Sequence, residues 1–178
     1  HHLSAGDVLI TVKDANGCFA DTVARIDEPD SLKASIQQLQ HITCKGKANG
    51  QVMVSATGGT LPYLYELNGI SNATGFFDSL LPGTHTIVIR DSNECSTSIT
   101  ITLTEPEELT FLDVEVTDVD CHGSSTGSLQ LQARGGTEPY EYRLDTFAYQ
   151  AEPQFSDLTA GNHTITVRDA NGCAFSQQ

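Results

Sequence analysis

The chain has 178 residues, of which 38% are apolar and 7% aromatic, and its formal net charge is −14. This apolar fraction can build hydrophobic cores, so we exclude a wholly disordered chain. The acidic balance excludes a general nucleic-acid binder, and no apolar run reaches the ~20 residues that a membrane-inserted helix needs.

The chain starts with His1-His2, which resembles the end of a purification tag, so we expect a fragment of a longer protein. In the segment that follows, Val8, Ile10 and Val12 occupy alternate positions. This period of two predicts a strand that is half-buried in an antiparallel sheet. Asn16-Gly17 then predicts a tight hairpin turn.

Similar alternation appears further along the chain, in residues 99–104 and 129–134. Gly58-Gly59 and Gly135-Gly136 lie between predicted strands, and no helical stripe is longer than two turns. Six strand-like runs per unit, spaced by roughly 8–12 residues, are typical of a β-sandwich. We therefore predict an all-β fold made of tandem immunoglobulin-like sandwiches, related to fibronectin type III and PKD domains.

The strongest signal is an internal repeat of about 77 residues. Residues 12–18 return at 89–95 and at 167–173, each time with the pattern Asp-x-Asn-x-Cys. The block from Cys44 to Gly58-Gly59 also returns, 77 residues later. These registers predict three parts: residues 1–28 as the last hairpin of a preceding repeat, 29–106 as a complete repeat, and 107–178 as a repeat without most of its last strand.

Five cysteines in such a β protein suggest disulfides. One scheme pairs them within repeats, as Cys44–Cys95 and Cys121–Cys173. A second scheme crosses the boundaries, as Cys18–Cys44 and Cys95–Cys121, and free thiols are a third possibility. If six strands alternate in direction, the turn after the first strand and the turn before the last lie at the same end, which favours the first scheme. A seventh extended segment would place these two turns at opposite ends.

The Asp-x-Asn turns have two interpretations, one of which is calcium binding. The weak calcium candidates are Asp14, Asn16, Asp91, Asn93, Asp169 and Asn171. An EF-hand loop needs a Glu at its twelfth position, where this chain has Arg25 and Thr102. We therefore favour a structural turn, in which Asn-Gly forms the hairpin and Asp caps it, and we expect no cofactor.

The histidines and tyrosines favour structural roles over catalytic or binding ones. His85 and His163 occupy equivalent positions, where packing or edge hydrogen bonding is expected. The pairs Tyr63/Tyr65 and Tyr140/Tyr142 each lie on one strand face and could stack sugars, but that face also takes a leucine, which favours core packing. We identify no catalytic constellation.

The repeated pattern Cys-x-Gly, Gly-Gly-Thr-x-Pro-Tyr-x-Tyr, Leu-x-x-Gly, Asp-x-Asn-x-Cys and Glu-Pro resembles the SprB-type repeat of Bacteroidetes surface proteins. In that family such repeats form long stalks of gliding-motility adhesins exported by the type 9 secretion system. The resemblance implies an extracellular, cell-surface location and neighbouring repeats as partners. It also implies a self-sufficient single repeat, which favours Cys44–Cys95 and Cys121–Cys173 and leaves Cys18 unpaired.

The resulting functional prediction is a non-enzymatic stalk repeat of a very large surface adhesin, involved in gliding and attachment. Two alternatives remain, a module that binds surface polysaccharide and an accessory domain of a secreted enzyme. Three Asp-Ser/Thr-apolar segments also resemble the Bacteroidetes O-glycosylation acceptor, at Thr22, Ser31 and Ser79.

Overall fold

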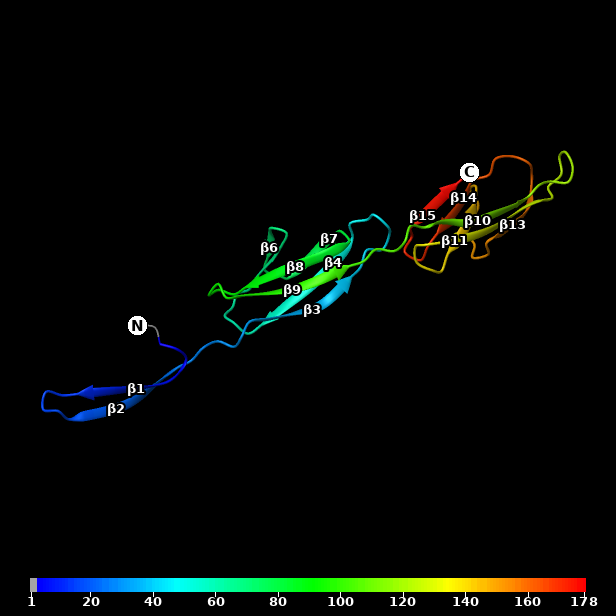
Figure 1. The fold of residues 1–178 in the computed structure, drawn as a ribbon. Helices are drawn as coiled ribbons and strands as arrows, with labels where there is room; N and C mark the ends of the chain where they lie inside the picture. Colours follow the sequence, from blue (N-terminus) through cyan, green and yellow to red (C-terminus); the bar gives the residue numbers. More distant parts are fainter. Residues whose placement is uncertain (1–2) are drawn as a thin grey trace. The chain divides into compact units, whose positions relative to one another are not determined.

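The computed structural model describes residues 3–178, and all of its regular elements are β-strands (Figure 1). His1-His2 lies outside the described residues. The first two strands, β1 (Gly6–Lys13) and β2 (Phe19–Ile26), form a sheet of their own. They pair antiparallel from Gly6 with Ile26 to Lys13 with Phe19, which confirms the predicted hairpin at Asn16-Gly17.

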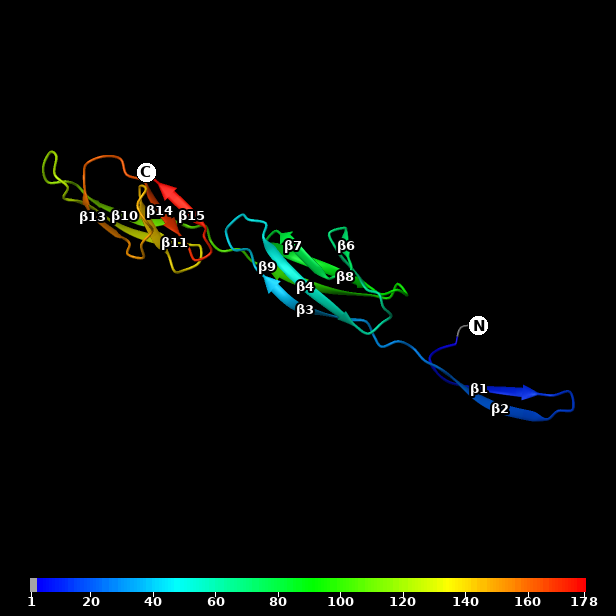
Figure 2. The same ribbon diagram turned by 180° about the vertical axis from the view of Figure 1, so that it is seen from behind.

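The middle repeat has seven strands in two sheets. The first sheet has the order β3-β4-β7 and the second the order β6-β5-β8-β9. Their bounds are β3 (Lys33–Gln40), β4 (Gly50–Thr57), β5 (Leu64–Leu67), β6 (Ile70–Asn72), β7 (Phe76–Leu80), β8 (Gly83–Arg90) and β9 (Ser96–Leu103). Figures 1 and 2 show this repeat from two sides.

The C-terminal repeat has the corresponding sheets β10-β11-β13 and β12-β14-β15. Their bounds are β10 (Thr110–Thr117), β11 (Gly127–Arg134), β12 (Glu141–Leu144), β13 (Gln154–Leu158), β14 (Ile165–Arg168) and β15 (Ala174–Gln177). An isolated bridge from Tyr142 to Gln150 stands where the middle repeat has β6.

Alternate side chains of these strands form the cores. The C-terminal core consists of Leu109, Leu129, Leu131, Tyr142, Leu144, Ile165 and Val167. Ile165 and Val167 are buried, as are their counterparts Ile87 and Ile89 in the middle repeat. This agreement confirms the predicted inward positions and the prediction of tandem immunoglobulin-like β-sandwiches.

Spatial packing divides the chain into two compact units. One contains the residues up to Ser35 together with Ser55–Thr74 and Ile87–Ile99. The other contains Ile36–Val54, Gly75–Thr86 and Thr100–Gln178. This division does not follow the 77-residue period, so the boundaries at 29 and 107 stay a prediction. Within residues 3–178 no helix is long and apolar enough to cross a membrane.

Candidate functional site

Two recurring motifs of the repeat, Asp-x-Asn-x-Cys and Gly-Gly-Thr, meet at the buried carboxylate of Asp169. Its Oδ1 accepts hydrogen bonds from the amides of Asn171 (2.9 Å) and Cys173 (2.8 Å). Its Oδ2 accepts one from the amide of Thr137 (2.9 Å), which belongs to the Gly-Gly-Thr motif. We call residues 169–173 and their equivalents 14–18 and 91–95 the aspartate turns. The carboxylate therefore connects the turn before β15 to the connection between β11 and β12.

The two glycines of the Gly-Gly pair are needed because other parts of the chain approach their backbone closely. Gly135 has φ +73, and a Cβ there would lie 2.0 Å from the carbonyl oxygen of Glu108. Gly136 has φ +62, and its Cβ would lie 2.7 Å from Oδ2 of Asp169. A side chain at either position would be strained and would collide with its neighbour. Gly135 is thus required for the close approach of the backbone at Glu108, and Gly136 for that of the aspartate turn.

The middle repeat builds the same site around Asp91. Its carboxylate accepts hydrogen bonds from the amides of Asn93, Cys95 and Thr60, each at 2.9 Å. Burial by itself would raise the pKa of Asp91, but these hydrogen bonds outweigh burial and lower it. In the β1–β2 hairpin, the carboxylate of Asp14 accepts hydrogen bonds from two amides of its own turn, those of Asn16 (2.9 Å) and Cys18 (2.8 Å).

The predicted calcium candidates thus have hydrogen-bonded partners within the protein. The Asn171 amide group donates to Thr137 Oγ1 (3.0 Å), and Asn93 donates to Thr60 Oγ1 at the same distance. These bonds have the geometry of the structural turn. Among the residues that the structure describes, no three His, Cys, Asp or Glu side chains are grouped as a metal site would need. Calcium binding stays a prediction that a titration would decide.

The disulfide differs from both predicted schemes, because the structure joins Cys44 to Cys173. The predicted pairs Cys44–Cys95 and Cys121–Cys173 are therefore wrong. So are the alternative pairs across the boundaries, because Cys18, Cys95 and Cys121 are exposed free thiols. The unpaired state of Cys18 agrees with the expectation, and Cys44 and Cys173 are disulfide-bonded as expected, although with each other instead of the predicted partners.

The correction has a topological reason. The C-terminal repeat has seven extended segments once the bridge at Gln150 is included, instead of the six expected. In seven alternating segments, the connection after the first and the connection before the last lie at opposite ends. Cys121 lies in the first of these connections and Cys173 in the second, so they cannot meet. The seven strands of the middle repeat give the same argument for Cys44 and Cys95.

The loop that carries Cys44 is held at two further points. Thr43 presents its carbonyl oxygen to the side-chain amide of Asn171 (3.2 Å). Glu105, from the Glu-Pro junction, accepts hydrogen bonds from Lys45 Nζ and from the amide of Gly46 (2.9 Å). The bond from Lys45, followed by that from Gly46, lowers the pKa of Glu105. The disulfide, Asn171 and Glu105 together form what we call the junction site.

His163 forms a second polar site in the C-terminal repeat. Its Nδ1 lies 2.9 Å from Asp145 Oδ2, and its Nε2 lies 3.0 Å from the carbonyl oxygen of Thr159. The bond to Asp145, followed by that to Thr159, raises the pKa of His163. The bond from His163, followed by the amide of Thr164, lowers the pKa of Asp145. The equivalent His85 lies 2.9 Å from the carbonyl oxygen of Leu81, and Asn68 stands where Asp145 does.

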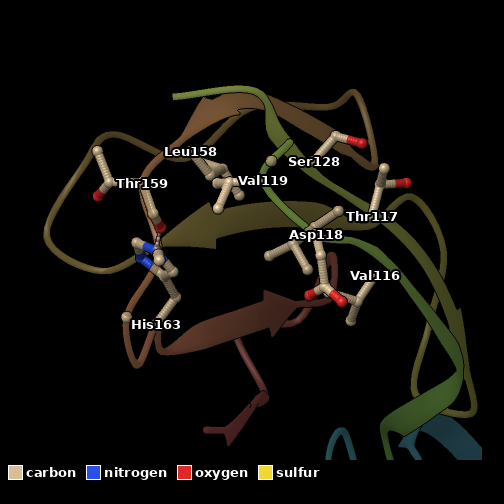
Figure 3. A pocket seen from close by; sticks show the side chains of 12 residues that line it. Val116, Thr117, Asp118, Val119, Ser128, Leu158, Thr159 and His163 are labelled. Carbon is tan, nitrogen blue, oxygen red and sulfur yellow. Dashed lines mark hydrogen bonds between the residues drawn. The ribbon is translucent and has the colours of Figure 1, made fainter. Parts of the chain in front are cut away.

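A pocket of about 280 Å³ lies beside His163, between Val116, Val119 and Leu158 (Figure 3). In the middle repeat the corresponding place is filled by β9, because a Cβ on Gly50 would lie 2.7 Å from Leu103 Cδ1. At Gly127, the equivalent of Gly50, the nearest atoms to such a Cβ belong to Leu158, at 3.0 and 3.4 Å, and to the Thr117 carbonyl, at 3.4 Å. The pocket therefore corresponds to a core position of the repeat.

The tyrosines are engaged within the fold. Tyr65 and Tyr142 are buried, and the hydroxyl groups of Tyr63 and Tyr140 donate to the carbonyl oxygens of Gly58 (2.6 Å) and Gly135 (2.7 Å). These positions fit the structural interpretation better than sugar stacking. The three residues of the glycosylation hypothesis are exposed: Thr22, Ser31 and Ser79.

Some residues of these sites gave no clear signal in the sequence. Thr43 contacts Asn171 through its carbonyl oxygen, which any residue type would supply. Asp145 is not repeated, because the middle repeat has Asn68 at that position. Asp169 has a stronger signal in the sequence, since its motif and the Gly-Gly-Thr motif recur together, with Thr and Asp 31 residues apart in one repeat and 32 in the other.

Comparison with known proteins finds a family model that is similar to the repeat at two places. The family model of the SprB repeat matches residues 37–72 and 114–148, which confirms the resemblance at both places. No curated protein matches the chain significantly. A solved structure, the C-terminal 282-residue fragment of intimin in complex with the translocated intimin receptor (Tir) intimin-binding domain, aligns with 15% identity and a TM-score of 0.42. The alignment covers 80% of this chain and 62% of that one, so this chain spans less than two thirds of its length.

Proposed function

We propose that this chain, with its two SprB repeats, is a stalk segment of a bacterial surface adhesin. The proposal includes export to the cell surface by type 9 secretion, a role in gliding motility and a Bacteroidetes source, all from the family resemblance. The chain acts without catalysis, and its partners are neighbouring repeats. A net charge of −14 would keep neighbouring stalks soluble and mutually repelling.

The observation that supports a mechanical role is the Cys44–Cys173 bond. It connects the SprB repeat of residues 37–72 to the turn that follows the SprB repeat of residues 114–148, over a sequence separation of 129. When the two ends of the chain are pulled, tension passes through this bond and the residues between the two cysteines carry none. Adhesion to a surface generates such tension, and a covalent bypass limits how far the stalk extends.

Single-molecule pulling from the two termini tests this role. At ~3.3–3.6 Å per extended residue, the bypass of 129 residues should shorten the fully stretched oxidised chain by about 430–460 Å relative to the reduced chain. Cys44→Ser should extend fully without reductant, whereas Cys18→Ser should keep the short extension. Equal extension of the oxidised and reduced chains would contradict a load-limiting role.

A further inference from the structure

The cysteines of the repeat fall into two structural classes. Cys44 and Cys121 lie in the loop after the first strand of a repeat and are called loop cysteines here. Cys18, Cys95 and Cys173 close the aspartate turns and are called turn cysteines. The observed disulfide joins one member of each class, at a Cα–Cα distance of 5.8 Å.

The loop around the free cysteine Cys121 has the same conformation as the loop around the bonded cysteine Cys44. The Cys121 carbonyl oxygen accepts a hydrogen bond from the amide of Ser124 (3.0 Å), and that of Cys44 accepts one from Lys47 (3.1 Å). In each loop a glycine lies between the cysteine and the residue that donates to it, and this glycine has a positive φ, +74 at Gly46 and +81 at Gly123. The two loops therefore turn in the same way before β4 and β11.

The free turn cysteines also match their bonded counterpart. In all three turns the cysteine amide donates to the aspartate Oδ1, over 2.8 Å at Cys18, 2.9 Å at Cys95 and 2.8 Å at Cys173. The aspartate amide donates back to the cysteine carbonyl oxygen in each case, over 2.9–3.0 Å.

The contact that Asn171 makes beside the bond is also available at the free thiols. Asn171 reaches the loop through the backbone carbonyl oxygen of Thr43, so this contact does not depend on the side chain at that loop position. Asp120 stands at this position beside Cys121, and Asn93 is the equivalent of Asn171 beside Cys95. All three free thiols are exposed.

We propose that Cys121 is a disulfide half-site for the turn cysteines, Cys95 or Cys18, of a second copy of this chain. The bond is directional, because a loop cysteine pairs with a turn cysteine and neither class pairs with itself. In a tandem array the second copy is the neighbouring repeat, and the tether brings the two thiols to an effective concentration on the order of millimolar. Each repeat would then be bonded covalently to the next.

The bond forms by thiol–disulfide exchange with a low-molecular-weight disulfide such as oxidised glutathione. One protein thiolate attacks oxidised glutathione, and one glutathione thiolate leaves. The second protein thiolate attacks the mixed disulfide, and the other glutathione leaves. Two protein thiols lose two protons and two electrons, and one glutathione disulfide is reduced to two thiols.

The test is oxidation of the concentrated chain by oxidised glutathione, followed by non-reducing electrophoresis and peptide mapping. The starting protein carries the Cys44–Cys173 bond and three free thiols. Cross-linked species should contain Cys121–Cys95 and Cys121–Cys18 peptides. Cys121→Ser should abolish cross-linking although two exposed thiols remain, whereas Cys95→Ser, the matched control, should retain the Cys121–Cys18 product.

Three results would overturn the proposal: turn–turn or Cys121–Cys121 pairs as main products, cross-linking that persists in Cys121→Ser, and thiols that end only as glutathione adducts. Peptide mapping of Cys44–Cys173 in each variant shows that the fold is retained. The pulling experiment uses only that internal bond, so its outcome is independent of this one.

Discussion

The β1–β2 and β14–β15 hairpins carry the same sequence pattern in different surroundings. Val12 is 61% exposed, whereas its equivalent Val167 is fully buried. The carboxylate of Asp14 accepts hydrogen bonds from two amides of its own turn, whereas that of Asp169 also accepts one from the amide of Thr137. The comparison shows that a hairpin and its turn form from local sequence, but burial and bonding require the rest of the sandwich.

The largest expected difference between the two hairpins concerns their cysteines. Cys44→Ser, which removes the partner of Cys173, should lower the free energy of unfolding by about 2–4 kcal/mol, since the unfolded chain loses a cross-link. Cys18→Ser, in the other hairpin, should change it by less than about 0.5 kcal/mol. Urea unfolding without reductant measures both, and equal midpoints for the two variants would show that the disulfide adds no stability.

The aspartates give the next comparison. Asp169→Ala leaves the amides of Thr137, Asn171 and Cys173 without their acceptor and should cost about 2–3 kcal/mol. Asp14→Ala, at an exposed turn, should leave the unfolding of both sandwiches unchanged. Thermal and urea unfolding followed by circular dichroism test the pair. A similar loss in both variants would mean that the bond to Thr137 is unimportant.

Val167 and Val12 are equivalent residues of the two hairpins, one buried and one exposed, so the same substitution can be made in both. Val167→Ala should destabilise the C-terminal repeat by about 2 kcal/mol, because it removes buried methyl groups and leaves a cavity. Val12→Ala should stay within about 0.5 kcal/mol of the parent. Hydrogen exchange at β12 and β14 should accelerate only in the first variant, and unchanged exchange there would argue against the described core.

The smallest effect is a pH dependence that the C-terminal repeat has and that Asp145→Asn should remove. His163 has a raised pKa, so its contribution is complete below its ordinary value of 6.5 and is lost as the pH rises through the folded-state pKa. Asp145 has a lowered pKa, so its contribution is present above its ordinary value of 3.8 and is lost as the pH falls through the folded-state pKa.

The pair therefore stabilises the repeat most between these two ordinary values, by less than about 1 kcal/mol because it is partly exposed. Asp145→Asn makes the site resemble the middle repeat, which has Asn68 there. Unfolding midpoints measured across this pH range in both proteins provide the check. A variant with the full pH dependence of the parent would show that other groups cause it.

The amino-acid sequence by itself determined the period, the strands and the turns. Alternating apolar residues predict strands because side chains point to opposite faces, and Ile87, Ile89, Ile165 and Val167 are buried as that period requires. Asn16-Gly17 and the aspartate turn depend on backbone conformations and hydrogen bonds within five residues, which the local sequence contains. The recurrence of these motifs was enough to predict the SprB repeat.

The disulfide was decided only by the tertiary structure. Its two cysteines are 129 residues apart, and their meeting depends on whether a repeat has six or seven extended segments. That number depends on the short strand β6 and on the single bridge at Gln150, which are too brief to produce a periodic pattern. The bond between Asp169 and Thr137 is equally non-local, because it forms only when two distant connections of the sandwich are brought together by the packing of its sheets.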